Sequence, residues 1–340
     1  TPAGDPDMTR LVAFGWNGPL AKRSGEVKAV IELNDAPTTV IYAEAQQRVT
    51  PSIAGQRAQR QLAQIERAQQ ALLVPLAQMR ASVLYRVQRA YNGIAVRVDA
   101  SQLAAITRLP GVKAIHPLVS KVRSNTGSVP LIGAPQVWSQ TVGANKAIGT
   151  GMKIAIIDSG IDYLHRDFGG PGTYPDTVTD TTPLAQLTGY FPSAKVAGGY
   201  DFAGDDYNAD PNSSAYQPEP HPDENPIDCL SDPATVGHGT HVAGTAAGLG
   251  VKADGTTYTG TYDSSIYNTP GFFRIGPGVA PGATLYAYRV FGCDGSTDVT
   301  DLAIDRAVDP NGDGNPSDHV DVINMSLGSS YGNNYDSTSV

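Results

Sequence analysis

The spacing of apolar side chains changes near residue 120, and this change divides the chain into two predicted domains. Before it, residues 27–33 and 112–116 are short β-favouring runs, and residues 51–80 carry alanine and leucine among glutamine and arginine at helical spacing. A bend in this long predicted helix would fall at Pro75, because proline removes a backbone donor and crowds the preceding turn.

A hairpin and a second helix complete the first pattern. Residues 83–91 and 94–98 favour strands, and Asn92-Gly93 between them supplies the positive φ angles of a tight hairpin turn. A short helix follows at residues 101–108. The order β-α-β-β-α-β predicts a small α+β domain of the split βαβ type, a four-stranded antiparallel sheet with two helices on one face. The expected boundaries are an irregular lead-in over residues 1–25 and this domain over residues 26–124.

The second predicted domain, residues 125–340, has a different pattern. Residues 153–157 form a continuous apolar run, which suits a parallel strand covered on both faces of its sheet. Further strands and helices alternate, so the pattern predicts a doubly wound α/β domain whose reactive groups belong at the carboxyl ends of its strands. The expected elements are surface loops over 169–235, a helix at 238–248, a strand at 283–290, a helix at 298–308 and a strand at 320–325.

Composition excludes several classes of protein and leaves a loop-rich globular chain. With 40% hydrophobic and 17% charged residues, 37 Gly and 25 Pro, the 340-residue chain resembles neither a coiled coil nor collagen. No apolar run reaches the roughly 20 residues that span a bilayer, so we expect no membrane span.

Charge is unevenly distributed between the predicted domains. Residues 1–124 contain 16 Lys and Arg and 8 Asp and Glu. The whole chain has 24 Lys and Arg and 33 Asp and Glu, so residues 125–340 contain 8 Lys and Arg and 25 Asp and Glu. The balances are thus +8 and −17. A basic segment followed by an acidic one indicates either a nucleic-acid arm or two parts that attract each other, and the acidity of the larger part argues against a nucleic-acid partner.

The number of cysteines and the first residues of the chain bear on whether the protein is secreted. Two cysteines, Cys229 and Cys293, exclude a four-cysteine zinc site and a disulfide-dense scaffold but leave room for one disulfide. The chain opens at Thr1 without an apolar leader, as we expect of a secreted protein after removal of its signal peptide and equally of a recombinant fragment.

Two motifs carry candidate chemistry. Asp158 ends the apolar run IAIID, so its carboxylate reaches the sheet edge, although a helix N-cap would explain it as well. His238 starts a helix rich in glycine and alanine that leaves space for a substrate chain. His241 lies one turn further on and is expected to be a buried structural histidine. The pair could be half of a metal site, but the Glu of an HExxH motif is missing.

A third motif, residues 321–328, is a strand that ends in Ser-Leu-Gly and by itself would be ordinary. Together, AIIDSGID, GHGTHVAGT and VINMSLGS resemble the subtilisin-like serine proteases (subtilases) in content and order. The stretch RIGPGVAPGATLYAYRVFGCDGSTDV is similar to the large extracellular Vpr-like branch of that family. Residues 26–119, with YNGIAVRV, resemble the inhibitor-type propeptide of such enzymes.

This resemblance implies a secreted serine endopeptidase precursor that acts on polypeptides and needs no organic cofactor. Asp158 corresponds to the aspartate that orients the catalytic histidine, and His238 to the general base and acid. The strands that bind an extended peptide correspond to Gly295, Ser326, Leu327 and Gly328.

The family's nucleophile motif does not occur up to residue 340, so we expect the triad serine in further sequence or in a second polypeptide. The alternative is an inactive truncated fragment whose propeptide acts as inhibitor and folding template. A third interpretation, a metal-dependent hydrolase, would use His238, His241 and nearby acids. The propeptide should act as an intramolecular inhibitor, with the first processing cut between Ser120 and Ser128.

Two supporting sites are expected within the implied fold. Oxygen ligands alternate at Asp309, Asn311 and Asp313, as at the start of an EF-hand-like calcium loop, with Asp318 as a further ligand, although position twelve is Val320 rather than Glu. The alternative is a polar turn. Cys229 precedes His238 by nine residues and Cys293 lies just before Gly295. Their loops should flank the cleft, which favours a disulfide over two free thiols.

Overall fold

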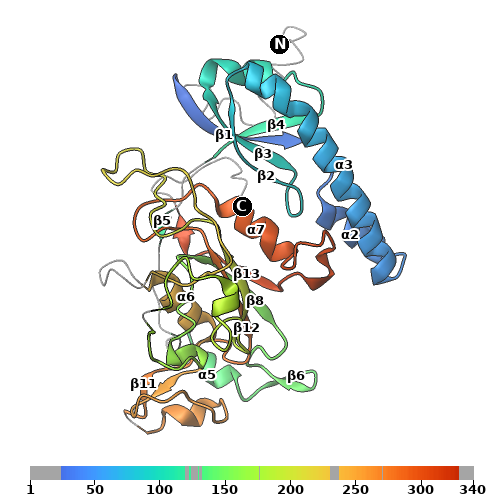
Figure 1. The fold of residues 1–340 in the computed structure, drawn as a ribbon. Coiled ribbons are helices and arrows are strands. Elements are labelled where there is room, and N and C mark those ends of the chain that lie inside the picture. Colours follow the sequence, from blue (N-terminus) through green and yellow to red (C-terminus); the bar gives the residue numbers. More distant parts are fainter. Residues whose placement is uncertain are drawn as a thin grey trace. The chain divides into compact units, whose positions relative to one another are not determined.

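Two compact units make up the computed structural model, and each is described by itself (Figure 1). The first comprises the residues up to Val119 together with Ile304–His319, and the second comprises Ser120–Ala303 and Val320–Gly328. The structure describes residues 24–118, 122–123, 129, 132–175, 177–229, 237–269 and 271–328.

The first unit contains a four-stranded antiparallel sheet with the strand order β2-β3-β1-β4, which confirms the predicted split βαβ fold. Its strands are β1 (Glu26–Leu33), β2 (Ser82–Val87), β3 (Gly93–Asp99) and β4 (Val112–Pro117). Its helices are α2 (Thr38–Gln46), α3 (Pro51–Gln78), η1 (Ala100–Gln102) and α4 (Leu103–Ile106).

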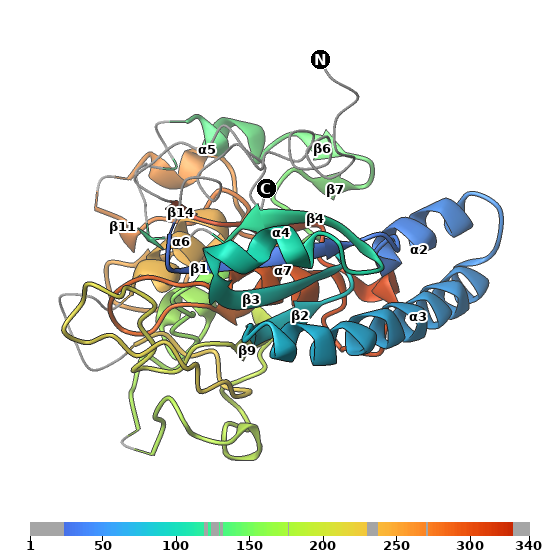
Figure 2. The same cartoon turned by 90° about the horizontal axis from the view of Figure 1, so that it is seen from above.

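Alternate side chains of β1 build the core of this unit, because successive residues of a strand point to opposite faces. Ala29, Ile31 and Leu33 are buried in one cluster with Leu76 of α3 and Leu103 of α4. The helix α2, which the sequence pattern did not predict, packs through its own buried residues on the first half of α3 (Figure 2).

The connection between β2 and β3 differs from the predicted two-residue turn. Val87 pairs with Gly93, so residues 88–92 form a longer loop and Gly93 belongs to β3. The buried amide of Gln69 replaces turn hydrogen bonds, because its Nε2 donates to the carbonyl oxygens of Val87 and Gly93. Gly93 is required for close packing, since a Cβ there would lie 2.9 Å from the side chain of Val30.

The second unit contains a four-stranded parallel sheet with the order β13-β8-β12-β9, and the predicted α/β class is confirmed. The strands are β8 (Lys153–Asp158), β9 (Val196–Asp201), β12 (Thr284–Arg289) and β13 (Val322–Asn324). Later strands are added on both sides of β8, and such a switch point is where open α/β sheets place their sites.

The edge strand β9 lies inside the stretch expected to be surface loops. Its sequence VAGGYD has two glycines, which weaken a strand pattern. Both are needed by the sheet itself, because a Cβ at Gly198 would meet the ring of Tyr286 and one at Gly199 would meet the backbone of Ala287.

The remaining described elements are two longer helices and several short helical or extended segments. The helices are α6 (His238–Ala247) and α7 (Thr300–Val308). The short segments are β5 (Val122–Arg123), α5 (Ala134–Val137), β6 (Thr141–Val142), β7 (Asn145–Lys146), η2 (Arg166–Phe168), η3 (Leu184–Gln186), β10 (Val251–Lys252), η4 (Ser264–Tyr267), β11 (Phe273–Ile275), η5 (Pro316–Asp318) and β14 (Leu327–Gly328). Among the helices that the structure describes, none is both long and apolar enough for a membrane crossing.

Candidate active site

A carboxylate and an imidazole meet at the carboxyl end of the central strand β8. Asp158 is fully buried there, and its Oδ1 accepts hydrogen bonds from Nδ1 of His238 at 2.7 Å and from the backbone N–H of Ser159 at 2.7 Å. Nε2 of His238 is also buried and has no hydrogen-bond partner among the described residues. The carboxylate therefore fixes the proton on Nδ1 and leaves the lone pair of Nε2 available to accept one.

Glycines allow the helix that carries His238 to approach β8 closely. Gly237, at the N-cap of α6, has φ +85°, a conformation that residues with a Cβ rarely adopt. A Cβ on Gly239 would lie 2.2 Å from the carbonyl oxygen of Gly160. The glycine-rich sequence around His238 thus serves packing against the end of β8.

The residues expected to bind substrate lie in the chain segments that follow β13 and β12. Leu327 and Gly328 form β14, which pairs antiparallel with Arg123 and Val122 of β5. Ser326 precedes β14, and its hydroxyl donates to Oδ1 of Asn324 at 3.1 Å.

Gly295 lies beyond the end of β12, with φ +88°, and belongs to none of the strand ladders formed by the described residues. A Cβ there would lie 2.0 Å from Oδ1 of Asn208, so close packing requires the glycine. Ser120 and Ser128, which bound the expected processing region, are outside the described residues.

Comparison with known families decides what this arrangement belongs to. A sequence model described as "Subtilase family" matches residues 149–340, more than half of the chain. The chain belongs to the subtilase family. A second model, "Peptidase inhibitor I9", matches residues 30–118, which contain the sheet of the first unit.

Individual relatives of this subtilase are distant. It is 29% identical over 265 residues to the minor extracellular protease Vpr of Bacillus subtilis (strain 168), covering 72% of this chain and 24% of Vpr. It is 44% identical over 95 residues to a subtilisin of Bacillus sp. (strain TA39), covering 28% of this chain and 17% of that protein. The chain thus spans about a quarter or less of the length of these two relatives.

Among solved structures, this subtilase is similar to fervidolysin from Fervidobacterium pennivorans, a keratinolytic enzyme related to subtilisin. The TM-score is 0.39 at 15% identity, covering 91% of this chain and 37% of that chain.

His241 is not the buried structural residue that the sequence suggested. Its side chain is exposed and lines a cavity of about 660 Å³, together with His165, Phe272 and Phe273. His241 follows His238 by three positions, about one helical turn further along α6. Of the described residues, only Asp205, Cys229 and Cys293 bring three metal-binding atoms close together, so the metal site considered for His238 and His241 has no such cluster around it.

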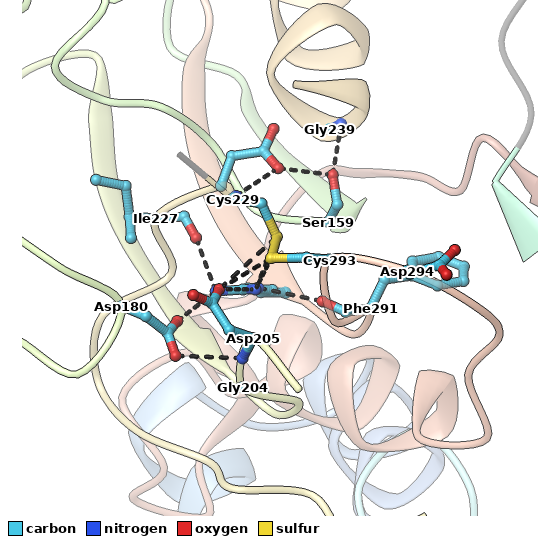
Figure 3. The surroundings of a disulfide bond; sticks show 12 residues. Ser159, Asp180, Gly204, Asp205, Ile227, Cys229, Gly239, Phe291, Cys293 and Asp294 are labelled. Carbon is cyan, nitrogen blue, oxygen red and sulfur yellow. Dashed lines mark hydrogen bonds and ion pairs between the residues drawn. A yellow bond between two sulfur atoms is a disulfide. The ribbon is translucent and has the colours of Figure 1, made fainter. Parts of the chain in front are cut away.

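Cys229 and Cys293 form a disulfide (Figure 3). A buried arginine, Arg289, which no sequence motif indicated, lies 3.1 Å from the sulfur of Cys229. Arg289 is fully buried; it donates to Asp205 at 2.6 Å, to the side chain of Asp180, and lies 3.2 Å from Asp201. Burial raises the pKa of Asp201, while the adjacent guanidinium opposes this shift. The sequence signal for this buried arginine is that Arg289 is the one charged residue of β12 and lies at its end.

The loop expected to bind calcium belongs to the first unit of this subtilase. Asp309 is buried and accepts hydrogen bonds from the backbone N–H of Gly314 at 2.9 Å, from Gly312 at 3.1 Å and from the side chain of Arg89. The other predicted ligands also accept backbone N–H groups: Asn311 from Asp313, Asp313 from Asn315 and Asp318 from Asn311. A cation at Asp309 would therefore compete with the Arg89 guanidinium.

Proposed function

We propose that this chain comprises the propeptide and the first part of the catalytic domain of a secreted serine endopeptidase. The observation that carries the proposal is the hydrogen bond between Asp158 and Nδ1 of His238 at the end of β8. Secretion is supported by the disulfide, which suits an oxidising compartment, and by the name of the distant relative Vpr, an extracellular protease.

The proposed reaction is peptide-bond hydrolysis through an acyl-enzyme. Nε2 of His238 takes the proton of a serine hydroxyl while the serine oxygen attacks the scissile carbonyl, and the same proton then goes to the leaving amine. Asp158 keeps the imidazole in the required tautomer and stabilises the imidazolium. The nucleophilic serine is proposed to come from outside residues 1–340, because the family's motif for it does not occur within them.

The propeptide, expected over residues 26–124, is proposed to act as the intramolecular inhibitor of this protease. The pairing of β5 with β14 supports this role, since Val122 and Arg123 add a strand where an extended polypeptide substrate would add one. The same pairing supports the alternative in which the chain works only as inhibitor and folding template, so activity of the full-length protein distinguishes the two. Calcium at Asp309, Asn311, Asp313 and Asp318 remains a prediction, and no organic cofactor is proposed.

The test is hydrolysis of a chromogenic peptide by the full-length protein and its His238→Ala variant. We expect a loss of kcat on the order of 10⁴ to 10⁶, because the general base is removed. His241→Ala is the matched control, with the same substitution one turn along α6 at an exposed position, and should retain kcat within about threefold. Full activity in folded His238→Ala would contradict the proposal.

A further inference from the structure

The helix that carries His238 begins without a capping side chain of its own. Its N-cap is Gly237, and the first backbone N–H groups of a helix have no partner within the helix. Two side chains from elsewhere accept them. Ser159 Oγ accepts the N–H of Gly239 at 2.9 Å, and Asp228 Oδ2 accepts the N–H of Thr240 at 3.0 Å.

Asp228 is the centre of this arrangement, because its carboxylate accepts four hydrogen bonds. Its Oδ1 accepts the Ser159 hydroxyl at 2.9 Å and the Cys229 backbone N–H at 3.0 Å. Its Oδ2 accepts the backbone N–H of Thr240 and also the Thr240 hydroxyl, at 2.6 Å. The side chain is almost fully buried, and a carboxylate is the side chain of this size that offers four acceptor sites and no donor.

These contacts join Asp228 to the two elements that carry Asp158 and His238. Ser159 directly follows Asp158 at the end of β8, and Thr240 lies in the first turn of the helix that starts with His238. A negative charge at this end of α6 also interacts favourably with the helix dipole. Asp228 therefore fixes the first turn of α6 relative to the end of β8, which sets the separation of Asp158 and His238.

The two neighbours of Asp228 in the sequence, Ile227 and Cys229, are held by further contacts (Figure 3). Cys229, the next residue, is tied by the disulfide to Cys293, beyond the end of β12. The buried guanidinium of Arg289 donates to the carbonyl oxygen of Ile227, the preceding residue, at 3.2 Å. Asp228 thus lies between two anchored neighbours.

We propose that Asp228 is a positioning residue for His238, and that the Cys229–Cys293 disulfide and Arg289 hold it in place. The proposal rests on the proposed protease function. It assigns Asp228 no contact with substrate: it acts through the orientation of α6. Its loss should therefore lower kcat and leave KM nearly unchanged, because KM depends on the substrate-binding strands.

The test is Asp228→Asn in the full-length protein. An amide keeps the shape but replaces one acceptor oxygen with an NH₂ group, and in either orientation that group faces two donors. We expect kcat to fall about 10- to 100-fold, the range that a displacement near 1 Å produces in a catalytic group, with KM within about twofold of the wild type. The acidic limb of the pH profile of kcat/KM, which reports the ionisation of the general base in the free enzyme, should also shift.

Asp223→Asn is the matched control. This half-buried carboxylate lies in the same loop and accepts the backbone N–H of Asn225 at 2.7 Å. No described contact joins its side chain to α6, so kcat should stay within about twofold of the wild type. An equal loss of kcat in both variants would overturn the assignment, as would a folded Asp228→Asn protein with wild-type kcat and pH profile.

A spectroscopic readout separates this proposal from the proposed function. The proton shared between His238 Nδ1 and Asp158 gives a downfield ¹H resonance, which should shift or broaden in Asp228→Asn and remain in Asp223→Asn. If the wild-type protein hydrolyses no peptide, the proposed function fails and this resonance still tests the positioning. Should Asp228→Asn not fold, Ser159→Ala is judged by the same criteria, because it removes both the donor to Asp228 and the acceptor for Gly239.

Discussion

Asp158 Oδ1 lies 2.7 Å from Nδ1 of His238, although 80 residues of sequence separate them. Because this bond sets the tautomer, Asp158→Asn should present an amide that can donate to Nδ1 and move the imidazole proton to Nε2. We expect kcat of the full-length protein to fall by about 10⁴ with little change in KM. The measurement is steady-state hydrolysis of a chromogenic peptide, with a thermal melt to show that the variant folds. A kcat within tenfold of the wild type would contradict the role given to Asp158.

The pairing of β5 with β14 predicts which part of the propeptide inhibits. Residues 26–124, which include Val122 and Arg123, should inhibit the mature enzyme with an inhibition constant below roughly 100 μM at low salt. A fragment that ends at residue 118 lacks the strand and should inhibit at least tenfold more weakly. The opposite charges of the two parts add an attraction that salt screens, so inhibition should weaken as ionic strength rises. Equal inhibition by the two fragments would exclude β5 as the inhibitory strand.

The disulfide predicts a measurable loss of stability on reduction. Cys229 and Cys293 close a loop of 64 residues, and loop-closure entropy for that length corresponds to about 4 kcal/mol. Replacing both cysteines with alanine should therefore lower the free energy of unfolding by about that amount in urea titrations. The oxidised wild type and the dithiothreitol-treated wild type provide the comparison. A loss below 1 kcal/mol would mean that Arg289 and its carboxylates hold these loops without the disulfide.

The contact between Arg89 and Asp309 should affect calcium binding, if the loop at Asp309 binds calcium. The guanidinium lies on the Asp309 carboxylate, so calcium must displace it, and Arg89→Ala should strengthen calcium binding. The readout is the calcium-dependent rise in Tm against a chelated sample, which for a hundredfold excess over Kd corresponds to about 2.7 kcal/mol. Asp309→Asn combined with Asp313→Asn is the control and should abolish the rise. If the double variant keeps the whole response, the ion binds elsewhere.

Lys195 predicts a dependence of stability on pH. Burial lowers its pKa from 10.5 to about 8, although the charge of Asp167 opposes the shift. Between these values the unfolded state holds a proton that the folded state has lost, so this group's contribution to stability rises with pH. Between pH 8 and pH 9.5 the wild type should gain about 1 to 2 kcal/mol relative to Lys195→Met, measured by urea unfolding. Lys252→Met, at a more accessible lysine, should follow the wild-type slope; identical slopes for all three proteins would contradict the prediction.

The sequence alone determined most of the element order and singled out Asp158 and His238, which the structure brings into hydrogen-bond contact. A run such as residues 153–157 predicts its strand because a doubly covered strand must be apolar throughout, and Asp158 is conspicuous because it ends that run. His238 was found at a helix start marked by glycines. These signals are local, so they can be read from a few adjacent residues.

The tertiary structure decided which side chains become buried and what accepts their hydrogen bonds. β9 exists because its glycines fit against Tyr286 and Ala287, the β2–β3 loop is longer because Gln69 supplies its hydrogen bonds, and His241 is exposed beside a cavity.

The environment of Asp158 and His238 could not be predicted from local sequence patterns either. Asp228 and Arg289 acquire their roles from donors and acceptors far away in the chain. An isolated buried charge is strongly unfavourable, so its position is set by partners that only folding brings together.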